Sequence, residues 1–139
     1  MRKRTQAREF ALQVLYKMDI CRELSDAALD SFWNDPPDEN IEEEVKKFTS
    51  ELVRGVEANS GEIDKEIIQY AENWQLERMS YVDRNILRLS SYELIFREDI
   101  PPKVSINEAV ELAKRYSGDD AGKFVNAILD KIKIEIGKE

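Results

Sequence analysis

A short segment near the C-terminus combines glycines with a lysine, the residue types that hold phosphate in nucleotide-binding loops. The segment is Gly118–Phe124, with the sequence GDDAGKF. Its glycine spacing is one residue shorter than in the phosphate loop, no serine or threonine follows Lys123, and a helix rather than a strand is predicted before it. We therefore reject nucleotide hydrolysis. A helix end followed by a new helix N-terminus explains both glycines and both aspartates, but not the closeness of Lys123, Phe124 and Asn126.

Basic residues gather at the N-terminus. Residues 1–22 hold six bases and two acids, residues 23–66 hold four bases and fourteen acids, and the whole chain has a formal net charge of -8. The first eight residues contain four bases and no acid: Arg2, Lys3, Arg4 and Arg8. A solvated helix end would show the same pattern, so charge alone leaves both interpretations open. The acidity of the rest disfavours duplex DNA, and a short single-stranded RNA fits a small basic patch better.

Arginines form a second cluster at Arg78, Arg84 and Arg88. The last two are four residues apart and so lie on one face of a predicted helix, where like charges repel by a few tenths of a kcal/mol. Asp83, Glu93 or a bound phosphate would compensate them. Pairing within the chain is the favoured explanation.

Aromatic residues near these bases allow more than one interpretation. Phe124 falls on an apolar helical stripe, which predicts a core position, and stacking on an unpaired base is the alternative. Tyr16 and Trp74 are expected as core or half-buried aromatics.

The composition excludes several classes of protein. The chain has no histidine and one cysteine, Cys21, so it has no Ser-His-Asp or Cys-His catalytic set, no internal disulfide and no structural zinc site. We expect no catalysis, no metal and no cofactor. No stretch reaches the roughly 18 apolar residues of a membrane span, and the basic start is not followed by a signal-peptide core. A cytoplasmic location is expected.

The elements that must position these residues are helices. Apolar residues spaced i, i+3, i+4 predict a first helix over about 5–21, a short second helix capped by Ser25 and ended by residues 34–37, and a third from Ile41 through Val56. A fourth helix is expected to be capped by Ser60 and to carry Trp74.

Three further helices complete the chain. Ser80 with Asp83 resembles a capping box and opens a helix through about Phe96, and Ser105 with Glu108 opens the next one. Gly118 ends that helix, and the last one spans about residues 121–136.

These elements predict an all-α fold. We find no apolar–polar alternation typical of strands, so a bundle of about seven helices in one domain, residues 1–139, is expected, and parallel-sheet enzyme folds are excluded. No repeat of solenoid length is visible.

Taken together, several segments resemble the NusB family of bacterial transcription antitermination factors in order and spacing, over nearly the whole chain. The carrying segments are Ala7–Glu9, Ala11–Gln13 and Leu15–Tyr16; Trp74, Arg78 and Val82–Arg88; Tyr92–Leu94 and Asp99–Pro101; Ile106–Lys114; and Lys123–Asn126 with Leu129–Asp130. Ala127 departs from the commonest family ending, Phe-Val-Asn-Gly, and is interpreted as a tolerated helix substitution.

The resemblance implies a fold, a function and partners. It implies two packed helical subdomains, about residues 1–77 and 78–139. NusB-like proteins pair with the small-subunit ribosomal protein that doubles as elongation factor NusE, and the pair binds the boxA element of nascent RNA, especially in ribosomal RNA operons. That complex joins RNA polymerase with other Nus factors and suppresses premature termination.

The resemblance also implies which residues contact RNA. The basic start corresponds to Arg2, Lys3, Arg4 and Arg8. A second RNA-facing region corresponds to Lys123, Phe124 and Asn126, with Arg84 and Arg88 as additions. Asp120 takes an acidic position near the RNA path.

Two other functions remain as alternatives. One is a helical protein-interaction adaptor whose basic end is incidental. The other is a fragment of a ribosomal RNA cytosine methyltransferase, because a similar domain precedes the catalytic part of some of these enzymes; the end of the chain at Glu139 leads us to expect no cofactor-binding domain.

Overall fold

The computed structural model describes residues 2–72 and 74–138, and within these ranges the chain folds into α-helices and one short 3-10 turn. The prediction of an all-α fold of about seven helices is confirmed. No helix within these ranges is both long and apolar enough to cross a membrane. The helices are α1 (Lys3–Cys21), α2 (Ser25–Asn34), α3 (Glu43–Ala58), α4 (Ser60–Tyr70), α5 (Tyr81–Phe96), α6 (Pro102–Tyr116) and α7 (Asp119–Glu135), and the 3-10 turn is η1 (Leu76–Arg78).

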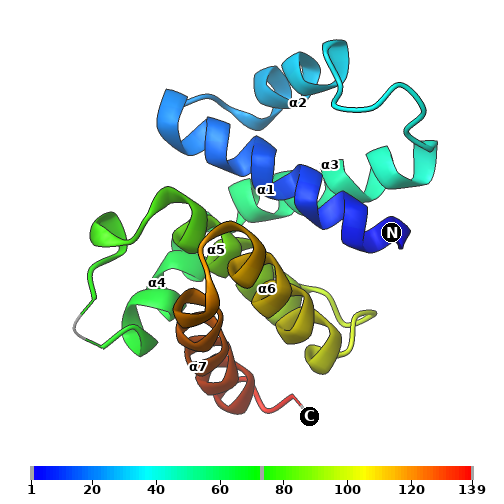
Figure 1. Cartoon of the computed structure of the whole chain (residues 1–139). Helices are drawn as coiled ribbons and strands as arrows, with labels where there is room; N and C mark the ends of the chain where they lie inside the picture. The colour runs from blue at the N-terminus through cyan, green and yellow to red at the C-terminus, as the bar shows by residue number, and fades with distance from the viewer. Residues whose placement is uncertain (1, 73, 139) are drawn as a thin grey trace.

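Helix α5 is the centre of the fold. It packs against α1, α3, α4, α6 and α7, and Figure 1 shows it between the group α1–α3 and the remaining helices. A helix surrounded in this way must be apolar on several faces. Ile86, Leu87, Leu89 and Leu94 are accordingly all at most 1% exposed.

The packing bears on where the two subdomains divide. The sequence led us to expect a division near residue 78, which would leave α4 with the first three helices. In the structure α4 contacts α5 and α7 more extensively than it contacts α3. We propose that the division falls between α3 and α4.

Two predicted helix starts show where local capping signals succeed and fail. Ser80 caps α5 as predicted, because its hydroxyl accepts a hydrogen bond of 3.0 Å from the Asp83 backbone N–H. The predicted cap at Ser105 is wrong. Helix α6 begins at Pro102, four residues earlier than a cap at Ser105 predicts, because Pro102 has no N–H to leave unpaired in the first turn. Ser105 is a buried residue that donates a hydrogen bond to Glu93.

The predicted caps at Ser25 and Ser60 are also wrong. Both residues lie inside their helices, and the positions before them are Leu24 and Asn59. At α2 the capping function comes from another helix, because the carboxylate of Glu57 in α3 accepts hydrogen bonds from the Ser25 backbone N–H and hydroxyl at 2.7 and 2.6 Å. A cap supplied across 32 residues of sequence leaves no local signal.

A buried ion pair joins α1 to α5. The guanidinium of Arg8 donates to both carboxylate oxygens of Glu93 at 2.8 and 2.9 Å, and the two side chains are 3% and 1% exposed. Glu108 of α6 accepts a third bond from Arg8 at 3.2 Å, and Ser105 donates to Glu93 at 2.9 Å. Burial would lower the pKa of Arg8, but the hydrogen bonds and charge of Glu93 outweigh it and raise that pKa, so the guanidinium stays charged although it is buried.

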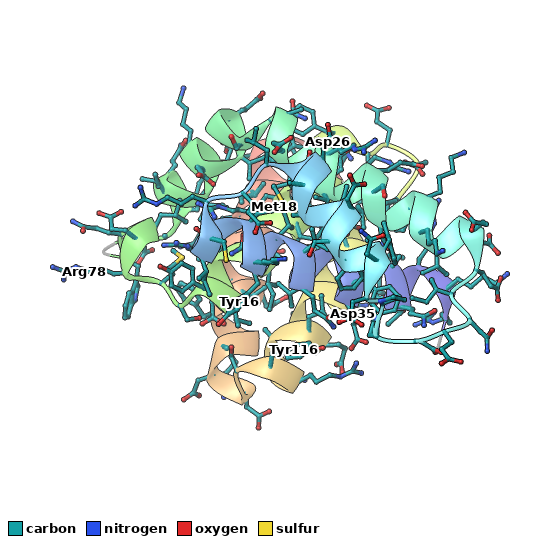
Figure 2. All side chains as sticks on the ribbon, turned by 90° about the horizontal axis from the view of Figure 1, so that it is seen from above. Tyr16, Met18, Asp26, Asp35, Arg78 and Tyr116 are labelled. Carbon is teal, nitrogen blue, oxygen red and sulfur yellow. The ribbon has the colours of Figure 1, made fainter. Side chains whose placement is uncertain are left out.

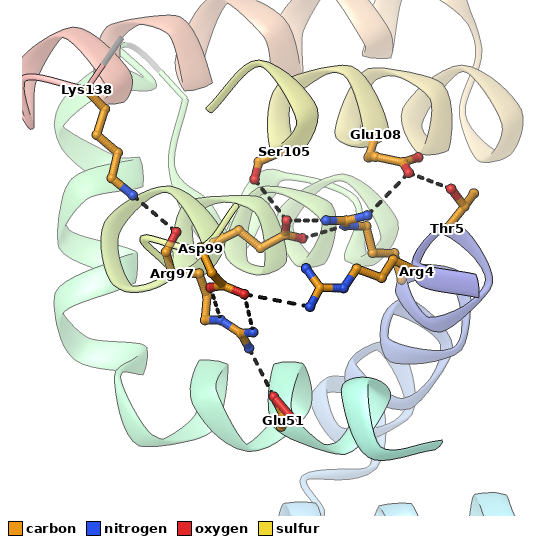
Figure 3. Close-up of polar contacts among 10 residues, drawn as sticks. Arg4, Thr5, Glu51, Arg97, Asp99, Ser105, Glu108 and Lys138 are labelled. Carbon is orange, nitrogen blue, oxygen red and sulfur yellow. Dashed lines mark hydrogen bonds and ion pairs between the residues drawn. The ribbon is translucent and has the colours of Figure 1, made fainter. Parts of the chain in front are cut away.

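A second polar cluster continues this network towards the surface (Figure 3). Arg97 donates to Asp99 through two nitrogens at 2.9 Å and to Glu51 of α3 at 3.3 Å. The hydrogen bonds from Arg97 lower the pKa of Asp99 to about 2. Arg97 and Arg4 both lie over the ring of Phe48, at 5.3 and 4.3 Å, so α1, α3 and the end of α5 meet around one aromatic side chain.

We expect Glu93→Ala to lower the free energy of unfolding by roughly 3–5 kcal/mol, because it would leave the charge of Arg8 buried without its partner. Urea unfolding followed by circular dichroism measures this. The control is Glu43→Ala, which removes a carboxylate that is 91% exposed and should change stability by less than about 0.5 kcal/mol. Equal stability of the two variants would contradict the role given to the pair.

Candidate nucleic-acid interface

The basic residues at the start of α1 lie at the surface, and two of them rest against carboxylates of the same chain. Arg2, Lys3 and Arg4 are exposed. The Lys3 ammonium pairs with Glu42 at 3.0 Å and also with Glu44, and Arg4 lies 3.7 Å from Asp99. Exposed pairs of this kind contribute between zero and about 1 kcal/mol, so an anionic ligand can replace these carboxylates.

Arg8 does not share this surface position. Its side chain is 3% exposed and its guanidinium is bound by Glu93 and Glu108. A role for Arg8 in RNA binding stays a prediction. The geometry gives Arg8 a structural function: it fixes the position of α1, the helix that carries the exposed bases, against α5 and α6.

Arg84 and Arg88 pair with carboxylates of the same chain instead of facing solvent. This agrees with the expectation that they are compensated within the chain. Asp19 at the end of α1 accepts bonds from Arg84 at 2.6 and 2.7 Å and from Arg88 at 3.0 Å, and Asp64 of α4 accepts two more from Arg88. The expected partners Asp83 and Glu93 are wrong: the partners are Asp19 and Asp64, which come from α1 and α4, and Glu93 pairs with Arg8 instead. Contact of either arginine with RNA stays a prediction.

Asp19 is the shared acceptor of this cluster. Burial would raise its pKa, but hydrogen bonds from Arg84 and Asn85 and the nearby charge of Arg88 outweigh burial and lower the pKa below its ordinary value. The cluster therefore ties α1, α4 and α5 together through an ionised carboxylate.

The glycine-containing segment forms the turn from α6 into α7. Gly118 precedes α7 with φ of 107°, a conformation that favours glycine, and Gly122 is buried where an added Cβ would lie 2.9 Å from the Lys114 side chain of α6. The backbone conformation of Gly118 and the close packing at Gly122 therefore explain why glycine occupies both positions, without a bound phosphate. Asp119 and Asp120 lie in the first turn of α7, as predicted.

The first residues of α7 line a hollow next to this turn. Lys123 and Asn126 are exposed, and Phe124 is half-buried, intermediate between its two predicted positions. A hollow of about 430 Å³ is lined by Phe124 and Asp120 together with Trp74, Arg78 and Asp83. Figure 2 shows Arg78 pointing outwards at the edge of the molecule.

Two aromatic residues are more exposed than the sequence predicted. Trp74 is 56% exposed and Tyr16 is 40% exposed, so the expectation of core or half-buried positions is wrong. Helix α4 ends at Tyr70, and Glu72 just beyond it has φ of 54°, which turns the chain before Trp74. The helical spacing of Trp74 after Ile67 and Tyr70 gave no sign of this turn.

The N-terminal bases and the hollow beside α7 lie at opposite ends of α6. Arg2 and Arg4 line a depression with Pro101 at the start of α6, while Asp120 follows its end. Helix α6 has 15 residues, which corresponds to a length of about 22 Å. The two parts of the candidate interface therefore lie about one helix length apart. Among the described residues no group of three or more histidine, cysteine or acidic side chains is placed to hold a metal ion.

Comparison with known proteins identifies the family. The sequence pattern of the NusB family matches residues 5–133. The chain belongs to the NusB family. Among its relatives, the transcription antitermination protein NusB of Anaeromyxobacter sp. (strain Fw109-5) is 50% identical over 130 residues, covering 94% of this chain and 89% of that protein. NusB of Myxococcus xanthus (strain DK1622) is 43% identical and covers 97% of both chains. The predictions of family and of a non-enzymatic function are confirmed.

Solved structures agree with this membership of the NusB family. NusB of T. maritima superposes with a TM-score of 0.86 at 41% identity, over 95% of this chain and 91% of the other. A chain in a complex of the antitermination factors NusB and NusE with double-stranded RNA has a TM-score of 0.86 at 32% identity, covering 97% and 98%. The NusB-like fold predicted from the sequence is therefore confirmed.

The Asp19 cluster predicts a dependence of stability on pH. The folded-state pKa of Asp19 lies below the unfolded value of about 3.9, so its contribution is present above about pH 4 and is lost as the pH falls through the folded-state pKa. We expect Asp19→Asn to lower stability at pH 7 and to remove part of the loss seen on acidification, as measured by urea unfolding between pH 7 and pH 2.5.

The control for this experiment is Asp26→Asn. Asp26 pairs with Arg54 at 3.0 Å but is 85% exposed, so its substitution should leave both the stability and its pH dependence nearly unchanged. An Asp19→Asn variant that behaves in the same way would show that the cluster contributes no net stability.

Proposed function

We propose that this NusB-family protein binds boxA-type RNA together with the ribosomal protein NusE and so supports antitermination in ribosomal RNA operons. The observation that carries the proposal is that exposed bases and an aromatic hollow lie near opposite ends of α6. At one end lie Arg2, Lys3 and Arg4, and at the other end Phe124 lines the hollow from a helix that also exposes Lys123 and Asn126. Cations that take phosphates and aromatic rings that take bases are the two components of single-strand binding.

The choice of partners rests on the related complex of NusB and NusE with RNA. An acidic protein repels RNA except at its basic edge, and a ribosomal protein that binds beside that edge adds cations of its own. We extend the proposal to assembly of the pair with RNA polymerase and other Nus factors, and therefore to action in the cytoplasm.

The decisive experiment is a titration of labelled boxA RNA into the protein with and without NusE. We expect single-stranded boxA RNA to bind more tightly than a scrambled strand or a duplex of the same sequence. NusE should tighten RNA binding, and RNA must then tighten NusE binding by the same factor, because coupling between two sites is reciprocal. Absence of any sequence preference in both conditions would overturn the proposal and favour an adaptor without an RNA ligand.

The N-terminal bases should determine how RNA binding depends on salt. With about four phosphate contacts, the log–log slope of affinity against salt should be roughly -3, and replacing Arg2, Lys3 and Arg4 by Ala should flatten it. Thermal stability should change little, because the three side chains are exposed. The double variant Arg54→Ala/Lys65→Ala is the control, because it removes positive charge from a part of the protein outside the proposed RNA surface. A large fall in Tm of the triple variant would assign these residues to the fold.

Asp120 should oppose RNA binding through its charge. It is exposed at the rim of the hollow, so Asp120→Asn should raise RNA affinity, and more at low than at high salt. Asp119→Asn, in the same first turn, controls for a general effect on the start of α7. Unchanged affinity of the Asp120 variant at low salt, with a small loss of stability, would leave Asp120 only its role at the helix N-terminus.

A further inference from the structure

A pair of aromatic side chains separates two neighbouring hollows. The rings of Trp74 and Phe124 are 6.3 Å apart, edge to face at 69°, and both residues line both hollows. The first hollow, of about 430 Å³, also contains Arg78, Asp83 and Asp120. The second, of about 260 Å³, lies between α4 and α7 and contains Tyr70, Ala127 and Lys131.

Trp74 is the feature of this region that folding does not explain. An indole that is 56% exposed contributes little burial to the core, and large aromatic side chains at a surface typically mark a binding site. The main chain at Trp74 is held, because its backbone N–H donates to the Ala71 carbonyl at 3.0 Å and η1 begins two residues later. The ring itself packs against Phe124. An exposed ring with one aromatic neighbour is suited to stacking.

The polar groups around the hollows match the parts of a nucleotide. Asp83 lines the first hollow, and one of its carboxylate oxygens has no hydrogen-bond partner among the described residues. A rotation of this side chain would present that unsatisfied acceptor to the amino group of a base. Arg78 stands beside the first hollow, where it can take a phosphate. Lys131 lies in the second hollow, where it pairs with Glu72 at 2.8 Å in an exposed and therefore exchangeable contact.

We propose that Trp74 is a second stacking residue, so that two successive unpaired bases lie on either side of the Trp74–Phe124 pair. This inference rests on the proposed RNA-binding function and extends the RNA path beyond Phe124, across Trp74, to Lys131 in the hollow between α4 and α7. The site is tolerant of base type at the stacking faces, because every base has a planar face.

An apolar protein segment is the other class of ligand that an exposed tryptophan accepts. The hollows favour a nucleotide because each combines a planar aromatic wall with a cation, and neither is wholly apolar. Binding of a protein partner at Trp74 is therefore treated as an outcome that overturns the proposal.

The test compares Trp74→Ala with Trp74→Phe in titrations of single-stranded boxA RNA in the presence of NusE. We expect Trp74→Ala to weaken RNA binding by roughly tenfold and Trp74→Phe to restore most of it, because the ring stacks and the indole N–H is not required. RNA shortened one nucleotide at a time from each end should abolish the difference between wild type and Trp74→Ala once the base on Trp74 is missing.

A second measurement follows the indole itself. Trp33 is the other tryptophan, and in a Trp33→Phe background the fluorescence of Trp74 should be quenched when RNA stacks on it. Leu24→Ala is the matched control, since Leu24 is 74% exposed, lies outside both hollows and should leave RNA affinity unchanged. Circular dichroism of each variant verifies the fold.

The outcomes separate this inference from the proposed function. If Phe124→Ala weakens RNA binding while Trp74→Ala binds as wild type with no quenching, the Trp74 site is wrong and the proposed function stands. If Trp74→Ala keeps RNA affinity in NusE-free titrations but loses NusE, the ring is a protein contact and the inference is overturned. If the wild type shows no preference for boxA RNA, the proposed function fails first.

Discussion

The buried pair of Arg8 and Glu93 is the constraint on which the arrangement of the helices depends. Two charges that are almost completely removed from water must satisfy each other, and this is possible only when α1 lies at one position along α5. Glu108 and Ser105 add bonds from α6, so three helices are aligned by one guanidinium and its partner. The exposed bases at the start of α1 are thereby placed beside the start of α6.

The same principle explains how an acidic chain keeps a basic edge. Of the bases expected at the RNA surface, Arg8, Arg84 and Arg88 are used within the fold, where Glu93, Asp19 and Asp64 compensate them. Arg2, Lys3 and Arg4 stay at the surface, with no more than weak exposed pairs. The fold thus separates structural arginines from those that remain accessible to phosphate, although their side chains are chemically alike.

The surface along α6 relates this separation to the function of the NusB family. Exposed cations lie near one end of α6 and aromatic rings near the other, and the helix itself is about 22 Å long. A folded small ligand would not span this distance, whereas an extended RNA strand would. Gly118 and Gly122 determine where the aromatic end lies, because they allow α7 to turn back after α6 and to pack closely against it.

The sequence by itself determined the helical class, the family and those boundaries that depend on neighbouring residues, such as the Ser80 cap and the break at Gly118. Helical periodicity and capping are local, so they can be read from adjacent residues. Only the tertiary structure decided which arginines are buried and where Trp74 lies. Arg8 and Glu93 are 85 residues apart, and Arg84 and Asp19 are 65 apart. Periodicity identifies the face on which a side chain lies but not the group that meets it, because that group comes from a helix elsewhere in the chain.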